Sequence, residues 1–185
     1  MKFLLILLLM CNAAIAKDFD TTPQDIESIG IPKGYKTVIY DKRYSFAVPE
    51  KYDIKRTPAE TEYMFVLSPK NKVLFGVYET PTMYLPKDFG LNITRKQLVS
   101  AFYDKTYASN KDINKVQKEI FKIATNIEVY KRNGFIFFRE DRNQDPEIKT
   151  IIAIASPLND DILTSTFSTD NEDLIMNFIK SFRVK

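Results

Sequence analysis

Histidine and tryptophan are absent from this sequence, and Cys11 is its only cysteine. Without histidine the chain has no Ser-His-Asp or Cys-His nucleophile system, no histidine-ligated zinc and no imidazole to carry protons near neutral pH. One cysteine allows no intramolecular disulfide, and Cys11 lies in the N-terminal segment that is expected to be removed, so we expect no thiolate metal site either. The five glycines form no Gly-x-Gly-x-x-Gly or Walker-type run, which excludes the common nucleotide cradles. We therefore expect no cofactor and no enzyme activity.

The first 16 residues have the three parts of a secretory signal peptide. Lys2 precedes a short apolar run at 3–10, and small residues ending in Ala16 follow it. Because that run is too short to span a bilayer, we predict cleavage after Ala16, export to the bacterial periplasm and no stable membrane insertion afterwards. The alternative is a lipoprotein attached through Cys11, although Met10 is bulky where lipidation signals have a small residue.

The charge balance is nearly even, with a formal net charge of +3. Nucleic-acid binding would require clustered basic side chains on one face, so we expect no nucleic-acid partner. One run does repeat lysines around two acids: Lys111, Asp112, Lys115, Lys118, Glu119 and Lys122. We interpret it as a solvated surface, with a docking patch for an acidic partner as the alternative.

The first half of the chain is rich in strand signals. A polar arm at 17–34, with two prolines and two glycines, leads into the domain. Apolar and β-branched runs separated by turn residues then predict strands and hairpins. These runs are 36–40, 44–48, 52–56, 62–67 and 73–78.

The second half mixes helices with strands. A capping box at Thr94 and Gln97 predicts an amphipathic helix that ends near 108–110 and lies on the sheet. A looser segment at 112–118 follows, and the turn Arg132-Asn133-Gly134 separates two later strands. The later strands are expected at 120–124, 127–130, 135–139, 148–156 and 162–168, with 135–139 apolar on both faces and hence central.

A second capping box, Thr169 to Glu172, predicts a final helix with an apolar stripe over 174–182, and the tail 183–185 is expected to be extended. Strands joined by tight turns are antiparallel. The order of elements therefore predicts an α+β fold, an antiparallel sheet flanked by helices, with 35–185 as a single domain.

Three acidic pairs are the remaining candidates for chemistry. Glu60 and Glu62 would share one face of an extended segment, where they could form an acid/base pair or bind a hard cation. Two neighbouring pairs at strand ends could supply calcium ligands: Glu140-Asp141 and Asp160-Asp161. None has the spacing of a calcium loop, so we interpret all three as strand edges or turns and predict no metal site.

The long loop at 80–92 is the candidate binding segment. Met83, Tyr84 and Leu85 lie between two prolines in it. Large apolar side chains exposed in such a loop suit contact with a partner, and the alternative is that they cap the end of the sheet.

Two motifs also suggest a family. The opening Phe46-Ala47-Val48-Pro49 and the close Phe178-Ile179-Lys180-Ser181-Phe182, over about 35–185, resemble the Mog1/PsbP-like superfamily, and most closely its bacterial exported DcrB-like branch. The resemblance implies an α/β/α sandwich and a binding role, without an active site. The chain departs from that branch because it lacks a good lipidation signal.

These observations favour a non-catalytic periplasmic protein that binds a protein partner in the bacterial envelope. A more specific alternative is an immunity protein that neutralises a toxin delivered to the periplasm. The least favoured alternative is a hydrolase that uses carboxylates alone, which would require two acids facing one cleft.

Overall fold

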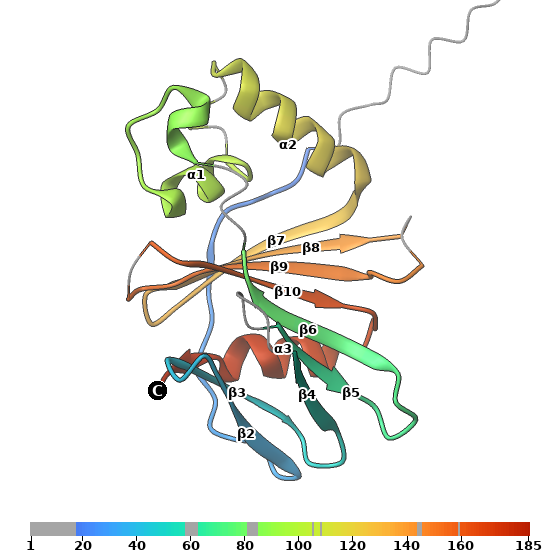
Figure 1. The fold of residues 1–185 in the computed structure, drawn as a ribbon. Helices are drawn as coiled ribbons and strands as arrows, with labels where there is room; N and C mark the ends of the chain where they lie inside the picture. Colours follow the sequence, from blue (N-terminus) through green and yellow to red (C-terminus); the bar gives the residue numbers. More distant parts are fainter. Residues whose placement is uncertain are drawn as a thin grey trace, which may run out of the picture.

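The computed structural model describes residues 18–57, 63–80, 85–104, 106–107, 109–143, 146–158 and 160–185 (Figure 1). The predicted signal peptide and its cleavage site lie outside these residues. The strands are β1 (Gln24–Asp25), β2 (Tyr35–Tyr40), β3 (Tyr44–Pro49), β4 (Asp53–Thr57), β5 (Tyr63–Leu67), β6 (Val73–Glu79), β7 (Ala124–Arg132), β8 (Phe135–Arg142), β9 (Thr150–Ala155), β10 (Ile162–Phe167) and β11 (Arg183–Val184). The helices are the 3₁₀ turn η1 (Pro86–Phe89), α1 (Arg95–Ala101), α2 (Lys111–Ile123) and α3 (Glu172–Ser181).

The strands form two sheets. The larger has the order β1-β7-β8-β9-β10-β6-β5-β4, and the smaller has the order β11-β3-β2. Neighbouring strands are antiparallel, except that β1 runs parallel to β7. Helices α1 and α2 lie on one side of the large sheet, and α3 with the small sheet lies on the other (Figure 1). The predicted α+β class, a sheet flanked by helices, is confirmed.

Hairpin turns are set by residues that tolerate a left-handed backbone. Asn133 and Gly134 join β7 to β8 with φ of 47° and 78°, the pair of positive values that a tight two-residue hairpin turn requires. β8 lies between β7 and β9, and its apolar first half, Phe135 to Phe138, is covered on both faces as the sequence predicts.

The face of the large sheet toward α3, called here the α3 face, is covered across most of its width. Phe178 of α3 is fully buried there, with its ring centroid 4.9 Å from that of Phe46, 5.4 Å from that of Phe75 and 5.4 Å from that of Phe167. The same core includes buried residues of β5 to β10: Met64, Val66, Phe75, Val77, Tyr130, Phe135, Phe137, Ile152, Ile154, Leu163 and Phe167. Burying so many large side chains in one layer supplies most of the hydrophobic stabilisation.

The opposite face, called here the α1–α2 face, is covered over part of its width only. Leu98 of α1 and Ile113 of α2 are buried against it, and the ring of Tyr103 stacks on that of Phe138 at 4.8 Å. The strand residues in this core belong to β7, β8, β9 and the start of β10: Ala124, Ile127, Val129, Phe138, Ala155 and Ile162. The predicted packing of the first helix on the sheet is therefore confirmed.

The segment after α1 differs from the prediction. α1 has the predicted capping box, with Thr94 Oγ1 accepting from Gln97 N at 3.1 Å, but it ends at Ala101 instead of near 108–110. The expected loose segment and the first four residues of the strand expected at 120–124 are one helix, α2, and only Ala124 belongs to a strand, as the first residue of β7. Asn110 caps it through hydrogen bonds from Asp112 N and Ile113 N, and its apolar residues recur on one face, so amphipathic spacing prevails over the local strand preference of the last turn.

Two smaller differences concern the ends. Asn171 caps α3 by accepting from Leu174 N at 2.9 Å, whereas Thr169 was the predicted cap. The polar arm supplies β1 and continues along the C-terminal end of the chain, where Ile29 N donates to Lys180 O and Arg132 Nη1 donates to Ser28 Oγ. The arm is thus a part of the sheet structure rather than only a leader to it.

Candidate functional site

The predicted binding segment is described only in part. Met83 and Tyr84 lie outside the described residues. Leu85 is half-buried and precedes η1, and its N–H donates to Asp88 Oδ2 at 3.1 Å. Phe89 follows and its ring packs on that of Phe102 at 5.6 Å. The described part of the loop is therefore tied to α1.

Arginines hold the acidic pair on β8. Glu140 is 2% exposed and accepts from Arg142 Nε at 2.6 Å. Asp141 points to the other face, where it accepts from Arg139 Nε at 3.1 Å and from Thr150 Oγ1 at 2.7 Å. Burial raises the pKa of Glu140, and the bond from Arg142 offsets only part of that shift. Glu140 and Asp141 therefore do not share one cleft.

The second pair also has structural partners. Asp160 accepts from Arg95 N at 2.6 Å and from Lys96 N at 2.9 Å, so it caps the first turn of α1 from a distant loop. Asp161 pairs with Arg43 Nη1 at 2.5 Å. Glu60 and Glu62 lie outside the described residues. Within the described ranges no group of three metal-binding side chains is close enough to hold an ion.

The lysine run lies on the exposed side of α2. Lys111, Lys115, Lys118 and Lys122 are all exposed, and they recur at the spacing of one helix face. Ile113 on the other side is buried against the sheet. Any amphipathic surface helix has such a face, so this arrangement adds nothing specific in favour of the docking alternative.

The α1–α2 face of the large sheet has a half that the described helices leave open. It consists of the outward residues of β4, β5 and β6, on the far side of the sheet from β7 (Figure 1). Alternation places Tyr63, Phe65 and Leu67 of β5 on this side, while Met64 and Val66 between them are fully buried on the α3 face. We call this surface the open half-face.

A groove of about 560 Å³ runs over the open half-face. Phe65 and Leu67 are half-buried in it, and Val73 is 47% exposed, which makes it one of few large apolar side chains exposed in the described chain. Phe65 also covers the backbone of Gly76, where an added Cβ would lie 3.2 Å from the Phe65 ring. The described residues that line it are Lys55, Thr57, Phe65, Leu67, Asn71 and Val73.

Tyrosines extend the open half-face beside the groove. The rings of Tyr63 and Tyr78 stack at 5.3 Å, and burial raises the pKa of Tyr78. An antiparallel sheet with one solvated face normally carries polar residues there. Aromatic and aliphatic side chains on this surface are instead typical of the centre of a protein interface.

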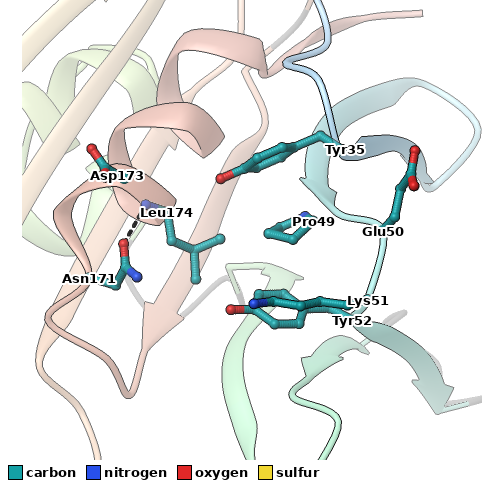
Figure 2. A pocket seen from close by; sticks show the side chains of 9 residues that line it. Tyr35, Pro49, Glu50, Lys51, Tyr52, Asn171, Asp173 and Leu174 are labelled. Carbon is teal, nitrogen blue, oxygen red and sulfur yellow. Dashed lines mark hydrogen bonds between the residues drawn. The ribbon is translucent and has the colours of Figure 1, made fainter.

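A second hollow, of about 510 Å³, lies between the β3–β4 turn and the start of α3 (Figure 2). Tyr35, Pro49 and Tyr52 face it from one side, and Leu174 faces it from α3. Its charges are mixed, because Glu50 and Asp173 stand at the rim while the Lys51 ammonium lies 5.6 Å from the centre of the Tyr52 ring.

Lys36 also contributes to the charge balance of this hollow. Its ammonium donates to Tyr52 O at 2.6 Å and to Glu50 O at 3.1 Å. These bonds fix the β3–β4 turn and place a further positive charge next to the residues that line the hollow. With acids and lysines interleaved, the hollow selects no one class of ligand. The open half-face is the better defined candidate.

Sequence reasoning missed the open half-face, although a signal for it was present. The run Tyr63–Leu67 is apolar at every position, which by itself predicts a strand covered on both faces. In the structure β5 is covered by described residues on the α3 face alone. A strand that is apolar on both faces and lies next to an edge strand is therefore the sequence signal for an uncovered apolar surface of this kind.

Comparisons with known proteins leave the family undetermined. No family model matches the chain, and no curated protein and no solved structure shows a significant match to it. None of the helices in the described part is long and apolar enough to cross a membrane. The likeness to the Mog1/PsbP-like superfamily remains a prediction that rests on the two motifs quoted above.

Proposed function

We propose that the chain is an exported, non-catalytic protein of the bacterial periplasm that binds a protein partner on its open half-face. The observation that carries the proposal is the contrast between the two faces of the large sheet. The α3 face is closed from β7 to β5, with Phe75 and Val66 fully buried, whereas Val73 on the opposite side is half exposed. Exposed apolar surface bordered by polar groups is typical of binding sites.

The non-catalytic part of the proposal draws on the chemistry of the described carboxylates. The most buried of them, Glu140, forms an ion pair with Arg142, and Asp160 accepts hydrogen bonds from backbone amides of α1. A carboxylate-only hydrolase needs an acid and a base on opposite sides of one cleft, about 5 to 10 Å apart. Among the described residues that line the groove on the open half-face, Lys55 is the only charged one.

Site-specific cross-linking in the native envelope tests this proposal. A photoreactive phenylalanine analogue at Leu67 or Val73 is expected to give a discrete adduct with one protein after irradiation. The same analogue at Lys118, on the exposed side of α2, serves as the matched control and is expected to give none. The identity of the adduct separates an envelope component from a delivered toxin.

A second arm tests the predicted loop. A double variant, Tyr84→Ala with Leu85→Ala, is expected to keep the Leu67 adduct if the open half-face alone carries binding, and to lose it if the loop contributes. Equal adducts from Leu67, Val73 and Lys118, or none from the first two, would contradict the proposal.

A further inference from the structure

The rim of the groove carries an excess of positive charge. Lys55 on β4 lines the groove, and Lys70 and Lys72 are exposed in the turn between β5 and β6, next to Asn71 and Val73. No ion pair within the described residues involves any of these three lysines. Asp53, which alternation places on the same side of β4 as Lys55, is the one acid there. As far as the described residues go, the groove is therefore apolar at its floor and basic at its edge.

The edge strand argues against an extended partner. β4 has the sequence Asp-Ile-Lys-Arg-Thr, and charged side chains along an edge strand are a common protection against pairing with another strand. Arg56 is also engaged, because its Nη2 donates to the backbone oxygen of Ile39 on β2. The charged side chains and the engaged Arg56 therefore both disfavour a partner that adds a strand to β4.

The covered half of the same face shows which kind of element packs on this sheet. There, α1 and α2 pack their apolar residues, among them Leu98 and Ile113, onto β7, β8 and β9. The floor of the groove on β4 to β6 has the same kind of side chain, in Phe65 and Leu67. A third helix laid on the open half-face would extend the existing helical layer across the sheet.

We infer that the groove receives an amphipathic helix of the partner protein, with aspartate or glutamate residues flanking the apolar stripe of that helix. The inference rests on the proposed function and specifies its partner. The stripe contacts Phe65, Leu67 and Val73, and the flanking carboxylates pair with Lys55, Lys70 and Lys72. Apolar burial supplies affinity, while the lysine rim supplies orientation and discrimination against basic helices.

Binding of designed helices tests the inference directly. The first probe is a fluorescent 18-residue helical peptide with leucines at i, i+3, i+4 and i+7 and glutamates beside them; the second has lysines in place of the glutamates. Fluorescence anisotropy with the mature chain is expected to show saturable binding of the glutamate peptide alone. Its affinity is expected to fall as salt is raised, because exposed ion pairs are screened.

Matched charge reversals locate the site. Reversing the rim with Lys55→Glu, Lys70→Glu and Lys72→Glu together is expected to weaken binding of the glutamate peptide roughly tenfold, since each exposed pair contributes a modest amount. The control reverses three lysines on α2, with Lys111→Glu, Lys115→Glu and Lys118→Glu, and is expected to change the affinity less than about twofold. Val73→Ser tests the apolar floor and is expected to weaken binding several-fold.

Several results would overturn the inference. Equal binding of the two peptides, equal loss in both triple variants, or binding of anionic phosphatidylglycerol vesicles in preference to the glutamate peptide would each do so. Failure of the inference is distinguishable from failure of the proposed function. An adduct from Leu67 that persists in the rim variant would keep the function and reject the acidic helix, whereas absence of any adduct would reject the function itself.

Discussion

Arg139 on β8 grips the carboxylate of Glu172, the first residue of α3, through two hydrogen bonds. The Nη1–Oε1 distance is 2.7 Å and the Nη2–Oε2 distance is 2.6 Å. The Arg139 side chain is only 8% exposed and also lies 3.3 Å from Glu128 and 3.1 Å from Asp141. This guanidinium thus fixes the start of α3 to the large sheet.

The pair predicts an acid-dependent contribution to stability. The Arg139 guanidinium lowers the pKa of Glu172 below its ordinary value of 4.5. A carboxyl group with a lowered pKa stabilises the fold above its ordinary pKa, and the contribution is lost as the pH falls through the pKa of the folded state. We expect Glu172→Gln to cost less than about 1 kcal/mol at pH 7, because Glu172 is largely exposed and screened.

Urea unfolding of the two proteins at several pH values measures this cost. The difference between wild type and Glu172→Gln should shrink as the pH falls below 4.5, and it should vanish once the pH is below the lowered pKa of Glu172 in the folded state. A difference that is the same at pH 7 and at pH 3 would show that the carboxylate charge is not its cause.

For Glu140 we expect the opposite dependence of stability on pH. Burial raises the pKa of Glu140 above 4.5, so the ionised carboxylate is less favourable in the folded state than in the unfolded state. The free energy of unfolding of wild type, relative to that of Glu140→Gln, should therefore rise as the pH is lowered from neutral toward 4.5. The same urea series measures it, and a relative fall over that interval would contradict the assigned cause.

Phe178 predicts the largest effect of a single truncation. It is fully buried, and its ring lies within 5.4 Å, centroid to centroid, of those of Phe46, Phe75, Phe167 and Phe182. We expect Phe178→Ala to lower the free energy of unfolding by about 3–5 kcal/mol through lost burial and a residual cavity. Phe178→Leu is the control and should cost clearly less; equal costs would mean that the cavity term is absent.

Asp160 predicts a local effect on α1. Its carboxylate accepts from two amides of the first helical turn, those of Arg95 and Lys96. We expect Asp160→Ala to cost about 1 kcal/mol and to speed amide hydrogen exchange in that turn, as loss of a helix cap does. Asp170→Ala, at an exposed acid just before α3, is the matched control; equal acceleration in α1 from both variants would refute the capping role.

The predicted signal peptide is tested by the mature N-terminus. Mass spectrometry of the protein recovered from the periplasm should find Lys17 as the first residue, because cleavage is expected after Ala16. Recovery of a form that begins at Cys11 and carries lipid would instead establish the lipoprotein alternative. An uncleaved chain in the cytoplasm would contradict both.

Much of the fold was predictable because its signals are local. The Asn133-Gly134 turn, the Thr94 capping box and the apolar first half of β8, Phe135 to Phe138, each depend on residues close in sequence. The chain at 120–123 was misread because β-branched and aromatic residues there favour a strand locally. Residues 120–123 are nevertheless helical, because the helix they end packs Ile113 and its apolar neighbours against the sheet.

The candidate site was less predictable than the fold. Sequence alone determined that the fold is α+β and that no histidine is available for catalysis or metal binding. It also predicts an export signal. Tertiary structure decided which apolar residues remain uncovered and which acids are engaged. Phe65 and Phe75 look alike in the sequence, yet Phe75 is buried under α3 while Phe65 lines the groove. The physical reason is that exposure depends on which distant element covers a strand, and periodicity along the strand carries no record of that element.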